Sequence, residues 1–466
     1  MHKIKFGTDG WRAVMCDEFT FANVRLVTQA IADYVGGRGT VLVGHDTRFL
    51  AEEFAVQAAE VLAGNGIPVE IVKGDVPTPV LAHAVVHRQC LGGVMFTASH
   101  NPPQYNGIKF IPHYGGPADD TITGSIEANL AQLTFEGVKG KPLAQAEGLV
   151  RCIELGDEYV DSVRSLVDFD GIARAGLRVV VDPMYGTGRK LLPRLLQEAG
   201  CLVDLIHDDR DPLFGGLSPE PTGAQLQDLI RLVRENNAHL GLATDGDADR
   251  FGVIDSTGDF ISANQVLVLL LAHLVENKGW RGDVVRTVAT THMLDRQAAH
   301  YGLTLHETPV GFKHICQLML KGEVLIGGEE SGGLSVGPHI PEKDGLLACL
   351  LLAELRAAEG KSLTSILQQI MGEVGGSCST RLDMHLPGNK KEGLMAVARD
   401  VEDSWQGRRI VRRIDVDGIK WIFADDAWCL IRPSGTEPLV RIYLEGADQE
   451  ALDGLKKDAL AFVDAL

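Results

Sequence analysis

The sequence predicts an α/β protein with three similar α/β domains, whose sheets are mixed but mostly parallel, and a smaller C-terminal α+β domain. The first observation is an order that recurs: a β-branched strand, a polar turn, an amphipathic helix ending near a glycine, and a second strand. Its three copies span residues 39–74, 177–207 and 283–308. Strands joined in this way run parallel and carry helices on the faces of their sheet. The second observation is length, because 466 residues are too many for one ordinary core.

The last part of the chain does not follow this order. A Gly- and Ser-rich stretch, residues 371–386, indicates a linker. Strand-like segments and then a helix follow, which predicts a small domain with an antiparallel sheet. We expect the strands at residues 381–386, 419–424, 427–433 and 440–446, and the helix at 448–466. The predicted domains are residues 1–150, 151–255, 256–373 and 374–466.

The composition is that of a globular protein with an excess of acidic residues. Apolar residues make up 45% of the chain, and the formal net charge of −19 comes from 63 acidic and 44 basic residues. A nucleic-acid-binding protein would need a basic face, so we expect no nucleic-acid partner. The overall field also repels phosphate, so a phosphate ligand would need a local group of Arg, Lys or backbone N–H donors.

Cysteine usage and the apolar runs indicate a cytoplasmic protein. The eight cysteines are scattered singly without a C-x-x-C pair, so we expect buried thiols in a reducing compartment, without a zinc site or disulfide framework. The first residues have no apolar stretch of the signal-peptide type. The longest apolar runs, such as residues 266–275, are too short to span a bilayer and suit a core helix, so no membrane partner is expected.

The first candidate site follows a predicted central strand. Pro102 and Pro103 forbid both helix and strand ladder, so the chain must turn outward and hold Ser99 at the mouth of the sheet. His100 flanks this serine and Lys109 follows it. Strand ends of this kind are where open α/β sheets tend to form their sites. The alternative is a polar turn whose side chains only satisfy local backbone groups.

The second candidate site holds Asp245, Asp247 and Asp249, at alternate positions after a buried-strand pattern. Three carboxylates so close together repel one another unless a cation neutralises them. Alternate positions in an extended loop point the same way, so these side chains offer hard oxygen ligands for Mg²⁺. An EF-hand loop is excluded, because Arg250 and Ser256 stand where its Gly and Glu are required. A solvated acidic turn is the remaining alternative.

The third candidate site is the segment 326–333, where small residues surround Glu329, Glu330 and Ser331. Backbone can approach a ligand there while the carboxylates accept hydrogen bonds from hydroxyl groups, which suits a sugar. An ordinary Gly-rich turn is the alternative. The overlapping G-x-S-x-G pattern of residues 333–337 is similar to a hydrolase nucleophile elbow, but the prolines that follow exclude the helix that an elbow needs.

The fourth candidate site, residues 432–438, follows a predicted strand. Arg432 offers a two-pronged hydrogen-bond donor for phosphate oxygens. Further donors are the side chains of Ser434 and Thr436 and the N–H groups around Gly435. Together they form a local phosphate cradle in a negatively charged chain. The alternative is a simple turn between two strands.

These four loops resemble the signatures of the α-D-phosphohexomutase family, the phosphoglucomutases and phosphomannomutases. The matching segments, in family order over nearly the whole chain, are FGTDGWR, TASHNPPQYNGIKF, DGDADR, GEESGG, HIPEKDG and RPSGTEP. The resemblance implies four domains around a central cleft. It also implies that Ser99 carries phosphate in the active enzyme, and that Mg²⁺ binds at Ser99 and the three aspartates of the second site.

The resemblance further implies the reaction. Phosphate passes from the serine to a hexose 1-phosphate, with glucose as the first expectation and mannose as the second, and glucose 1,6-bisphosphate is the intermediate and primer. The candidates for proton transfer are His100, Lys109 and Arg12. The candidates for contact with the sugar phosphate are Arg250, Lys313, Glu329, Ser331, Lys343, Arg432, Ser434, Gly435 and Thr436.

Other assignments stay open at this point. A phosphoglucosamine or phosphopentose mutase is the nearest, but Gly333 stands where glucosamine-type bacterial members commonly carry His, which weakens the glucosamine assignment. A catalytically silent sugar-phosphate binding protein is another, although the presence of Ser99, the three aspartates and Arg432 argues against it. A Mg²⁺-dependent phosphatase would let water take the phosphate from Ser99. Small hexose phosphates are the expected partners, and the sequence does not predict an oligomeric state.

Overall fold

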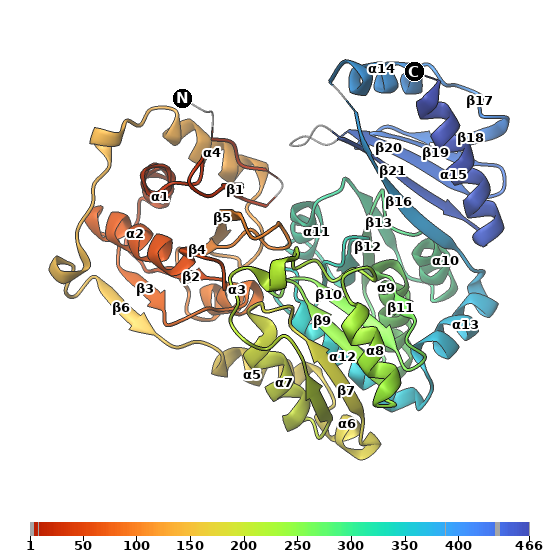
Figure 1. Ribbon diagram of the computed structural model, residues 1–466, viewed down its shortest axis with the longest axis horizontal. Helices are drawn as coiled ribbons and strands as arrows, with labels where there is room; N and C mark the ends of the chain where they lie inside the picture. Colours follow the sequence, from red (N-terminus) through yellow and green to blue (C-terminus); the bar gives the residue numbers. More distant parts are fainter. Residues whose placement is uncertain (1–3, 8, 387, 434–438, 466) are drawn as a thin grey trace.

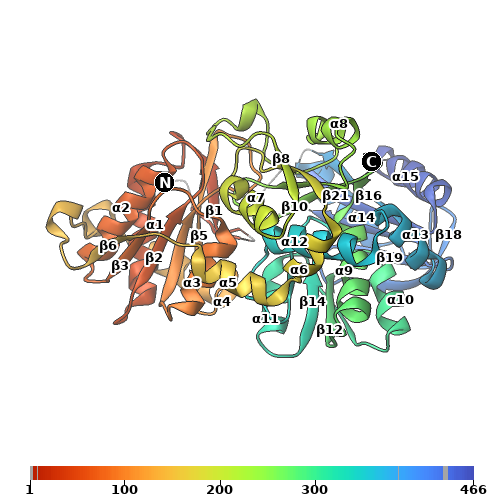
Figure 2. The same ribbon diagram turned by 90° about the horizontal axis from the view of Figure 1, so that it is seen from below.

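The structure is a computed structural model that describes residues 4–7, 9–386, 388–433 and 439–465. Its strands form four sheets that follow one another along the chain (Figure 1). Seen from below, the first sheet lies at one end of the molecule, the C-terminal sheet at the other, and the second and third sheets between them (Figure 2). The predicted architecture of three α/β domains and a C-terminal α+β domain is confirmed.

The first sheet has the strand order β1-β5-β4-β2-β3-β6. The strands β4, β2, β3 and β6 pair in parallel, and β5 runs antiparallel to both of its neighbours. The predicted unit at residues 39–74 is β2-α2-β3. The elements are β1 (Trp11–Val14), α1 (Phe21–Val35), β2 (Val41–His45), α2 (Ala51–Gly64), β3 (Val69–Val72), α3 (Thr78–His87), β4 (Gly92–Phe96), β5 (Tyr105–Pro112), α4 (Asp120–Leu130), the 3₁₀ turns η1 (Phe135–Gly137) and η2 (Leu143–Gln145), and β6 (Val150–Ile153).

The second sheet has the order β11-β10-β9-β7-β8, in which β7 is parallel to β8 and β9, and β10 is antiparallel to both of its neighbours. The predicted unit at residues 177–207 is β7-α7-β8. The elements are α5 (Asp157–Leu166), α6 (Phe169–Ala175), β7 (Arg178–Asp182), α7 (Gly188–Glu198), β8 (Leu202–Leu205), the 3₁₀ turn η3 (Phe214–Gly216), α8 (Gln227–Glu235), β9 (Leu240–Thr244), β10 (Phe251–Asp255) and β11 (Phe260–Ile261).

Two short strands lie beyond the sequence-based domain boundaries. β6 runs past residue 150 but pairs with β3 of the first sheet, and β11 lies past residue 255 but pairs with β10 of the second. Both are edge strands of their sheets. The boundaries themselves stay a prediction.

The third sheet has the order β13-β12-β14-β15, in which only β15 runs antiparallel to its neighbour. The predicted unit at residues 283–308 is β12-α10-β13, and the apolar run at 266–275 forms α9 and the π-helical turn after it. The elements are α9 (Ala263–Ala272), η4 (His273–Asn277), β12 (Asp283–Thr287), α10 (Met293–His300), β13 (Leu305–Thr308), α11 (Phe312–Met319), β14 (Val324–Gly328), β15 (Leu334–Val336), α12 (Gly345–Glu359) and α13 (Leu363–Val374).

The C-terminal sheet is antiparallel throughout, with the order β16-β21-β20-β19-β18-β17. Its strands include all four predicted ones, and only residues 375–377 separate α13 from β16, so the linker is shorter than expected. The sequence analysis missed β18, because four of its seven residues are arginines and hide the apolar alternation, and it also missed β17 and α14. The elements are β16 (Cys378–His385), α14 (Gly388–Arg399), β17 (Ser404–Trp405), β18 (Arg408–Ile414), β19 (Ile419–Phe423), β20 (Trp428–Pro433), β21 (Leu439–Gly446) and α15 (Gln449–Asp464).

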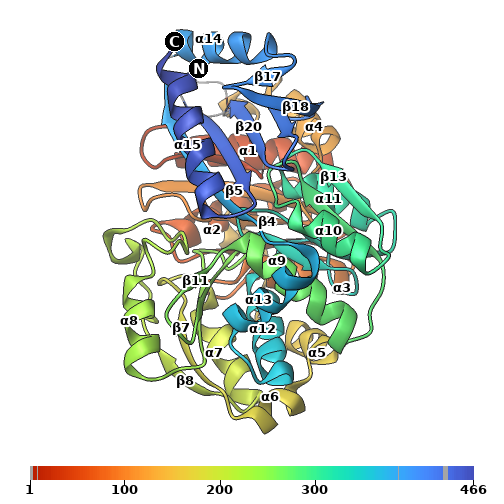
Figure 3. The ribbon, with the colours of Figure 1, turned by 90° about the vertical axis from the view of Figure 1, so that its right-hand side faces the viewer.

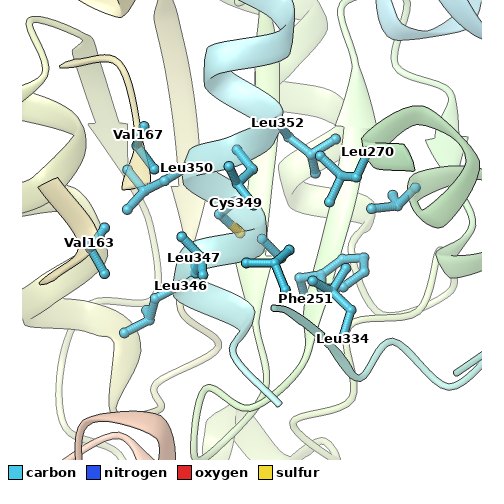
Figure 4. Packing of buried hydrophobic residues seen from close by; sticks show 14 of the residues in the cluster. Val163, Val167, Phe251, Leu270, Leu334, Leu346, Leu347, Cys349, Leu350 and Leu352 are labelled. Carbon is cyan, nitrogen blue, oxygen red and sulfur yellow. The ribbon is translucent and has the colours of Figure 1, made fainter. Parts of the chain in front are cut away.

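The helix α12 joins the second and third sheets into one hydrophobic core. Its residues from Gly345 to Leu355 are buried, and a helix that is apolar on all sides must be enclosed by other elements. It packs against α6, α7, β9 and β10 of the second sheet's layers. Figure 4 shows leucines of α12 between Val163 on one side and Leu270 on the other. The N-terminus of α12 is thereby carried to the carboxyl end of β9.

The C-terminal sheet packs on the third sheet through a smaller apolar cluster. Val288 and Ala289, after β12, contact Ile422, Trp428 and other residues of the C-terminal sheet. From the right-hand side, α14 and α15 lie at one end of the molecule and α6 and α8 at the other (Figure 3). The C-terminal sheet thus reaches the rest of the protein mainly through the third sheet.

Two sequence expectations concern thiols and membranes. All eight cysteines are free, but Cys16 and Cys152 are exposed, which corrects the prediction that all are buried thiols. Both lie in or beside short edge elements, where one face of the chain contacts solvent. Among the described residues, no helix is long and apolar enough to cross a membrane.

Candidate active site

The serine loop, residues 97–105, leaves the first sheet at the end of β4. Ser99 has a φ of 50°, a left-handed conformation that costs a non-glycine residue about 1 kcal/mol or more. Its amide donates a hydrogen bond to Thr97 Oγ1 at 2.8 Å, and its hydroxyl donates to Asp245 Oδ2 at 2.8 Å. Nδ1 of His100 lies 3.4 Å from the same hydroxyl oxygen. The residue is buried, so this loop does more than end a strand in solvent.

The aspartate loop, residues 245–250, follows β9 of the second sheet. Asp245, Asp247 and Asp249 are buried, and one carboxylate oxygen from each lies within 4.8 Å of the others. Within the part of the chain that the structure describes, Oδ1 of Asp247 and Oδ1 of Asp249 have no hydrogen-bond partner. Buried carboxylate oxygens need a partner, and a hard divalent cation supplies one. The residues present therefore fit Mg²⁺, and the burial contradicts a solvated acidic turn.

The repulsion within this loop is expressed at Asp245. Burial, followed by the charges of Asp249 and Asp247, raises the pKa of Asp245 well above its ordinary value. A bound divalent cation would reverse this effect, because it favours the ionised carboxylate.

Lys109, on β5, holds two of the three aspartates. Its ammonium group lies 2.9 Å from Asp247 Oδ2, 2.8 Å from Asp249 Oδ2 and 3.0 Å from Asp9 Oδ2. Burial opposes the charge, but these carboxylates outweigh it and keep the pKa of Lys109 above its ordinary value. Because Lys109 takes the Oδ2 atoms, the Oδ1 atoms of Asp247 and Asp249 are left for another partner.

Lys343 reaches the same cluster from the loop before α12. Its ammonium lies 3.2 Å from Asp9 Oδ2, 3.4 Å from Asp249 Oδ2 and 3.2 Å from Glu342 Oε1. It also lies 5.5 Å from the centre of the Phe312 ring. The two lysines thus share Asp9, whose pKa stays well below its ordinary value because they outweigh the effect of its burial.

Arg12 and His100 complete the cationic side of the site. Arg12 Nη1 donates to Asn101 Oδ1 at 2.8 Å, which fixes the arginine beside the serine loop, and Nη2 lies 3.9 Å from Asp9. Burial, then the neighbouring charges of Arg250 and Arg12, lowers the pKa of His100 well below its ordinary value. Its imidazole is therefore neutral at physiological pH in this arrangement.

The glutamate loop, residues 329–333, follows β14 of the third sheet. Glu329 Oε1 accepts a hydrogen bond from the Gly311 amide at 2.9 Å. Burial, then the charge of Glu330, raises the pKa of Glu329 to about 7. Gly333 pairs with Arg250 in an isolated antiparallel bridge, so the glutamate and aspartate loops are in direct contact. Ser331 lies in the turn of this loop, half-buried.

Gly333 also meets Lys343. A Cβ atom at this position would lie 2.5 Å from Lys343 Cδ and 3.4 Å from Glu329 Oε2. Only a residue without a side chain allows the stem of Lys343 to pass here on its way to Asp9 and Asp249. The glycine that departs from the family pattern is therefore filled by a lysine stem, and it does not leave open space.

Arg432, at the end of β20, brings the C-terminal sheet to the third. Its Nε donates to Asp417 Oδ2 at 2.8 Å, and the same oxygen accepts from the Val310 amide at 3.1 Å. Val310 is followed by Gly311, which contacts Glu329. The other members of the predicted phosphate cradle, Ser434, Gly435 and Thr436, lie outside the described residues.

Two predicted site residues have other surroundings. Lys313, on α11, pairs with Asp120 Oδ1 at 2.6 Å, so its ammonium contacts α4 of the first sheet's layers and stands apart from the aspartate cluster. Ser335 of the G-x-S-x-G pattern is buried on β15 and donates to the Ile340 carbonyl at 2.7 Å. The pattern is thus part of a strand, in agreement with the rejection of a nucleophile elbow.

Four residues of this region were missed from the sequence. Asp9 lies in the segment FGTDGWR, where only the arginine was chosen, and Arg48 follows the buried strand β2 closely, so both carried a signal. Thr78 donates to Asp247 Oδ2 at 2.7 Å and Asp417 holds Arg432, but neither lies in a recognisable motif. Their roles depend on contacts between different sheets.

Comparison with known protein families bears on the whole chain. Models described as phosphoglucomutase/phosphomannomutase alpha/beta/alpha domains I, II and III match residues 3–137, 157–258 and 262–374, and the C-terminal domain model matches 389–461. This fold, with a serine beside three buried aspartates, defines a phosphohexomutase, an isomerase that relocates the phosphate group of a sugar phosphate. The chain belongs to the phosphoglucomutase/phosphomannomutase family.

Individual relatives support this assignment over nearly their full length. The chain is 32% identical to "Probable phosphoglucosamine mutase" of Methanosphaera stadtmanae, over 98% of both proteins. It is 32% identical to "Phosphoglucomutase/phosphomannomutase" of Thermococcus kodakarensis, over 96% of this chain and 95% of the relative. A crystal structure from Thermus thermophilus, assigned as a phosphomannomutase, is 36% identical over 99% of both chains, with a TM-score of 0.87. The names share the reaction and differ in the sugar.

Proposed function

We propose that the protein interconverts hexose 1-phosphates and hexose 6-phosphates through phosphorylated Ser99 and a hexose 1,6-bisphosphate. The observation that carries the proposal is the 2.8 Å contact between Ser99 Oγ and Asp245, beside two buried aspartates that each keep one oxygen without a hydrogen bond from the described chain. Phosphoryl transfer needs mainly positioning and neutralisation of charge. Mg²⁺ held by the three aspartates would neutralise charge on the phosphate that Ser99 carries.

The transfer has two halves. The free hydroxyl of a hexose 1-phosphate attacks the phosphorus on Ser99, the bond from phosphorus to Ser99 Oγ breaks, and the sugar becomes a 1,6-bisphosphate. After the sugar turns, Ser99 Oγ takes the phosphate from carbon 1, and the hexose 6-phosphate is released. The attacking hydroxyl must lose its proton in the first half, and its counterpart must regain one in the second.

His100 is the favoured group for this proton transfer. Its Nδ1 lies 3.4 Å from Ser99 Oγ, where a reacting hydroxyl would also have to lie. Lys109 is less suited, because its ammonium already contacts three carboxylates and has no further proton to direct. Arg12 donates to Asn101, which supports a role in holding the serine loop and the transferring phosphate.

Recognition of the sugar phosphate is proposed for the third and C-terminal sheets. Glu329 and Ser331 would accept and donate hydrogen bonds to sugar hydroxyls. Arg432, with Ser434, Gly435 and Thr436, would bind the phosphate that does not react, and Arg250 would lie between the two ends. Lys343 would act by holding Asp9 and Asp249, and Lys313 by joining α11 to α4.

Glucose and mannose phosphates are the first proposed substrates, and glucosamine phosphates are the second. Relatives carry names of both kinds, which supports testing both. The Lys343 stem beside Gly333 gives this chain its own surface at the sugar. The cytoplasmic compartment belongs to the same proposal and is supported by eight free thiols.

The test is a coupled assay with the 1-phosphates of glucose, mannose, glucosamine and ribose. The highest kcat/KM identifies the sugar, and formation of the 6-phosphate without free phosphate separates a mutase from a phosphatase. In parallel, intact-mass and peptide analysis should locate phosphate on Ser99 after treatment with glucose 1,6-bisphosphate. An unphosphorylated enzyme with full activity and no need for a bisphosphate primer would overturn the phosphoserine route.

A further inference from the structure

Arg48 binds the backbone of the serine loop with its whole guanidinium group. Nη2 donates to the carbonyls of Ser99 at 2.7 Å and Asn101 at 2.6 Å. Nη1 donates to the carbonyls of Pro102 at 2.9 Å and Tyr105 at 3.0 Å. Nε donates to a carboxylate oxygen of Asp46 at 3.1 Å, so all five N–H donors of the side chain are used. The side chain has no solvent exposure.

This contact determines the conformation of Ser99. The left-handed φ of 50° is unfavourable for serine, so other contacts must hold it. Arg48 binds the Ser99 carbonyl, and Thr97 accepts from the Ser99 amide, so the peptide groups on both sides are fixed. With its backbone fixed in this way, Ser99 directs its hydroxyl to Asp245 at 2.8 Å. A single buried cation thus replaces the regular hydrogen bonds that the loop lacks.

Residues of the second sheet cover the same guanidinium group. The ring centre of Phe214, in the turn η3, lies 4.9 Å from the guanidinium carbon of Arg48. A Cβ atom on Gly246 of the aspartate loop would lie 2.7 Å from the Ser99 carbonyl oxygen and 3.7 Å from Phe214. The backbones of the serine and aspartate loops therefore meet at the carbonyl that Arg48 binds.

We propose that Arg48 is the positioning residue of the reaction, which holds Ser99 at its working distance from the aspartate loop, with Phe214 as the part of the second sheet that keeps the clamp closed. The inference rests on the proposed role of Ser99 as the phosphate carrier. Arg48 touches no reacting atom. It acts on kcat through the geometry of Ser99, because a displacement of about 1 Å at a reacting group lowers a rate on the order of 100-fold.

The experiment compares the wild type with Arg48→Lys, which keeps the charge but has three donors in place of five. We expect kcat to fall on the order of 100-fold, with KM for the hexose phosphate changed less than about threefold. The single-turnover rate of Ser99 phosphorylation by glucose 1,6-bisphosphate should fall in parallel. If the melting temperature falls while kcat per folded molecule stays at the wild-type value, Arg48 is only a structural residue and the inference is wrong.

Two further variants complete the test. If Arg48→Lys does not fold, Phe214→Leu decides: kcat lowered at least about threefold well below its melting temperature supports the clamp, and wild-type kcat overturns it. Arg88→Lys is the matched control, since Arg88 also joins the first and second sheets' layers, through Glu70 and Glu158, but lies apart from the serine loop. It should change stability alone. Absence of phosphate on Ser99 in the wild type would refute the proposed function itself, whatever the variants do.

Discussion

The two ends of the site differ in how firmly their charged groups are held. At the catalytic end, where the first and second sheets meet, Lys109 contacts three carboxylates and Arg48 binds four carbonyls of one loop. At the recognition end, on the third and C-terminal sheets, the Nε of Arg432 contacts one carboxylate, and Glu329 accepts one backbone hydrogen bond.

This difference follows from what each end must do. Charge that develops during phosphoryl transfer is stabilised best by groups that need no rearrangement. A sugar that turns between two half-reactions must be released and bound again, so its contacts need to be individually weak. We therefore expect substitutions at the catalytic end to lower kcat, and those at the recognition end to raise KM.

The largest expected effect is loss of the cation at the catalytic end. Chelation should abolish activity and Mg²⁺ should restore it, because the Oδ1 atoms of Asp247 and Asp249 accept no hydrogen bond from the described residues. Asp247→Asn should lower kcat on the order of 1000-fold, since a metal ion contributes several kcal/mol to charge stabilisation. Steady-state kinetics over a Mg²⁺ titration measures both effects. Asp228→Asn, on the exposed side of α8, is the control, and normal turnover in excess chelator would remove the metal assignment.

Arg432→Ala tests the recognition end. Loss of charge-assisted contacts to phosphate should lower kcat/KM by about 2–4 kcal/mol, or on the order of 30- to 1000-fold, mainly through KM. The melting temperature should stay unchanged, since the Arg432 side chain fills no core. Arg432→Lys should lie between the two, because an ammonium keeps the charge without the planar fork. If the alanine variant keeps wild-type kcat/KM, Arg432 is not the phosphate anchor.

Gly333→Ala tests the contact between the two ends. The added Cβ would lie 2.5 Å from Lys343 Cδ, so the lysine must move and its ammonium must leave Asp9 or Asp249. We expect kcat to fall about tenfold, together with a loss of stability of about 1–3 kcal/mol, as for other overpacked sites. Kinetics and chemical denaturation measure the two quantities. Gly372→Ala is the matched control, because its Cβ would meet no described atom within 4 Å.

The smallest effect concerns pH and stability at the recognition end. Burial raises the pKa of Glu329 to about 7, so the folded protein keeps a proton there that the unfolded chain releases above about pH 4.5. The stabilising effect of this proton is present below about pH 4.5 and is lost as pH rises to about 7. Glu329→Gln should remove this dependence, worth about 1–3 kcal/mol, from the stability–pH profile. Glu53→Gln, on the exposed face of α2, should leave the profile unchanged.

Local features of the sequence were sufficient to predict the chemistry of the loops. Ser99 and the three aspartates follow buried strands, and prolines or alternate spacing mark where each strand ends. These signals are local because strand patterns and breakers act over a few residues. The strand–helix–strand repeats were predicted for the same reason. β18 was missed because its arginines are apolar along their stems and charged only at their tips.

The partners of those residues were decided by tertiary structure alone. Lys343 meets Asp9 across 334 residues, and Lys109 meets Asp247 across 138. These contacts arise because α12 packs beneath the second sheet and carries Lys343 to the end of β9. A motif names the side chain that can react, but which carboxylate or carbonyl it meets depends on how the sheets pack. For this reason Lys313 was predicted to contact substrate, whereas its ammonium meets Asp120 of another sheet's layer, and the five-donor contact of Arg48 became visible only in the folded chain.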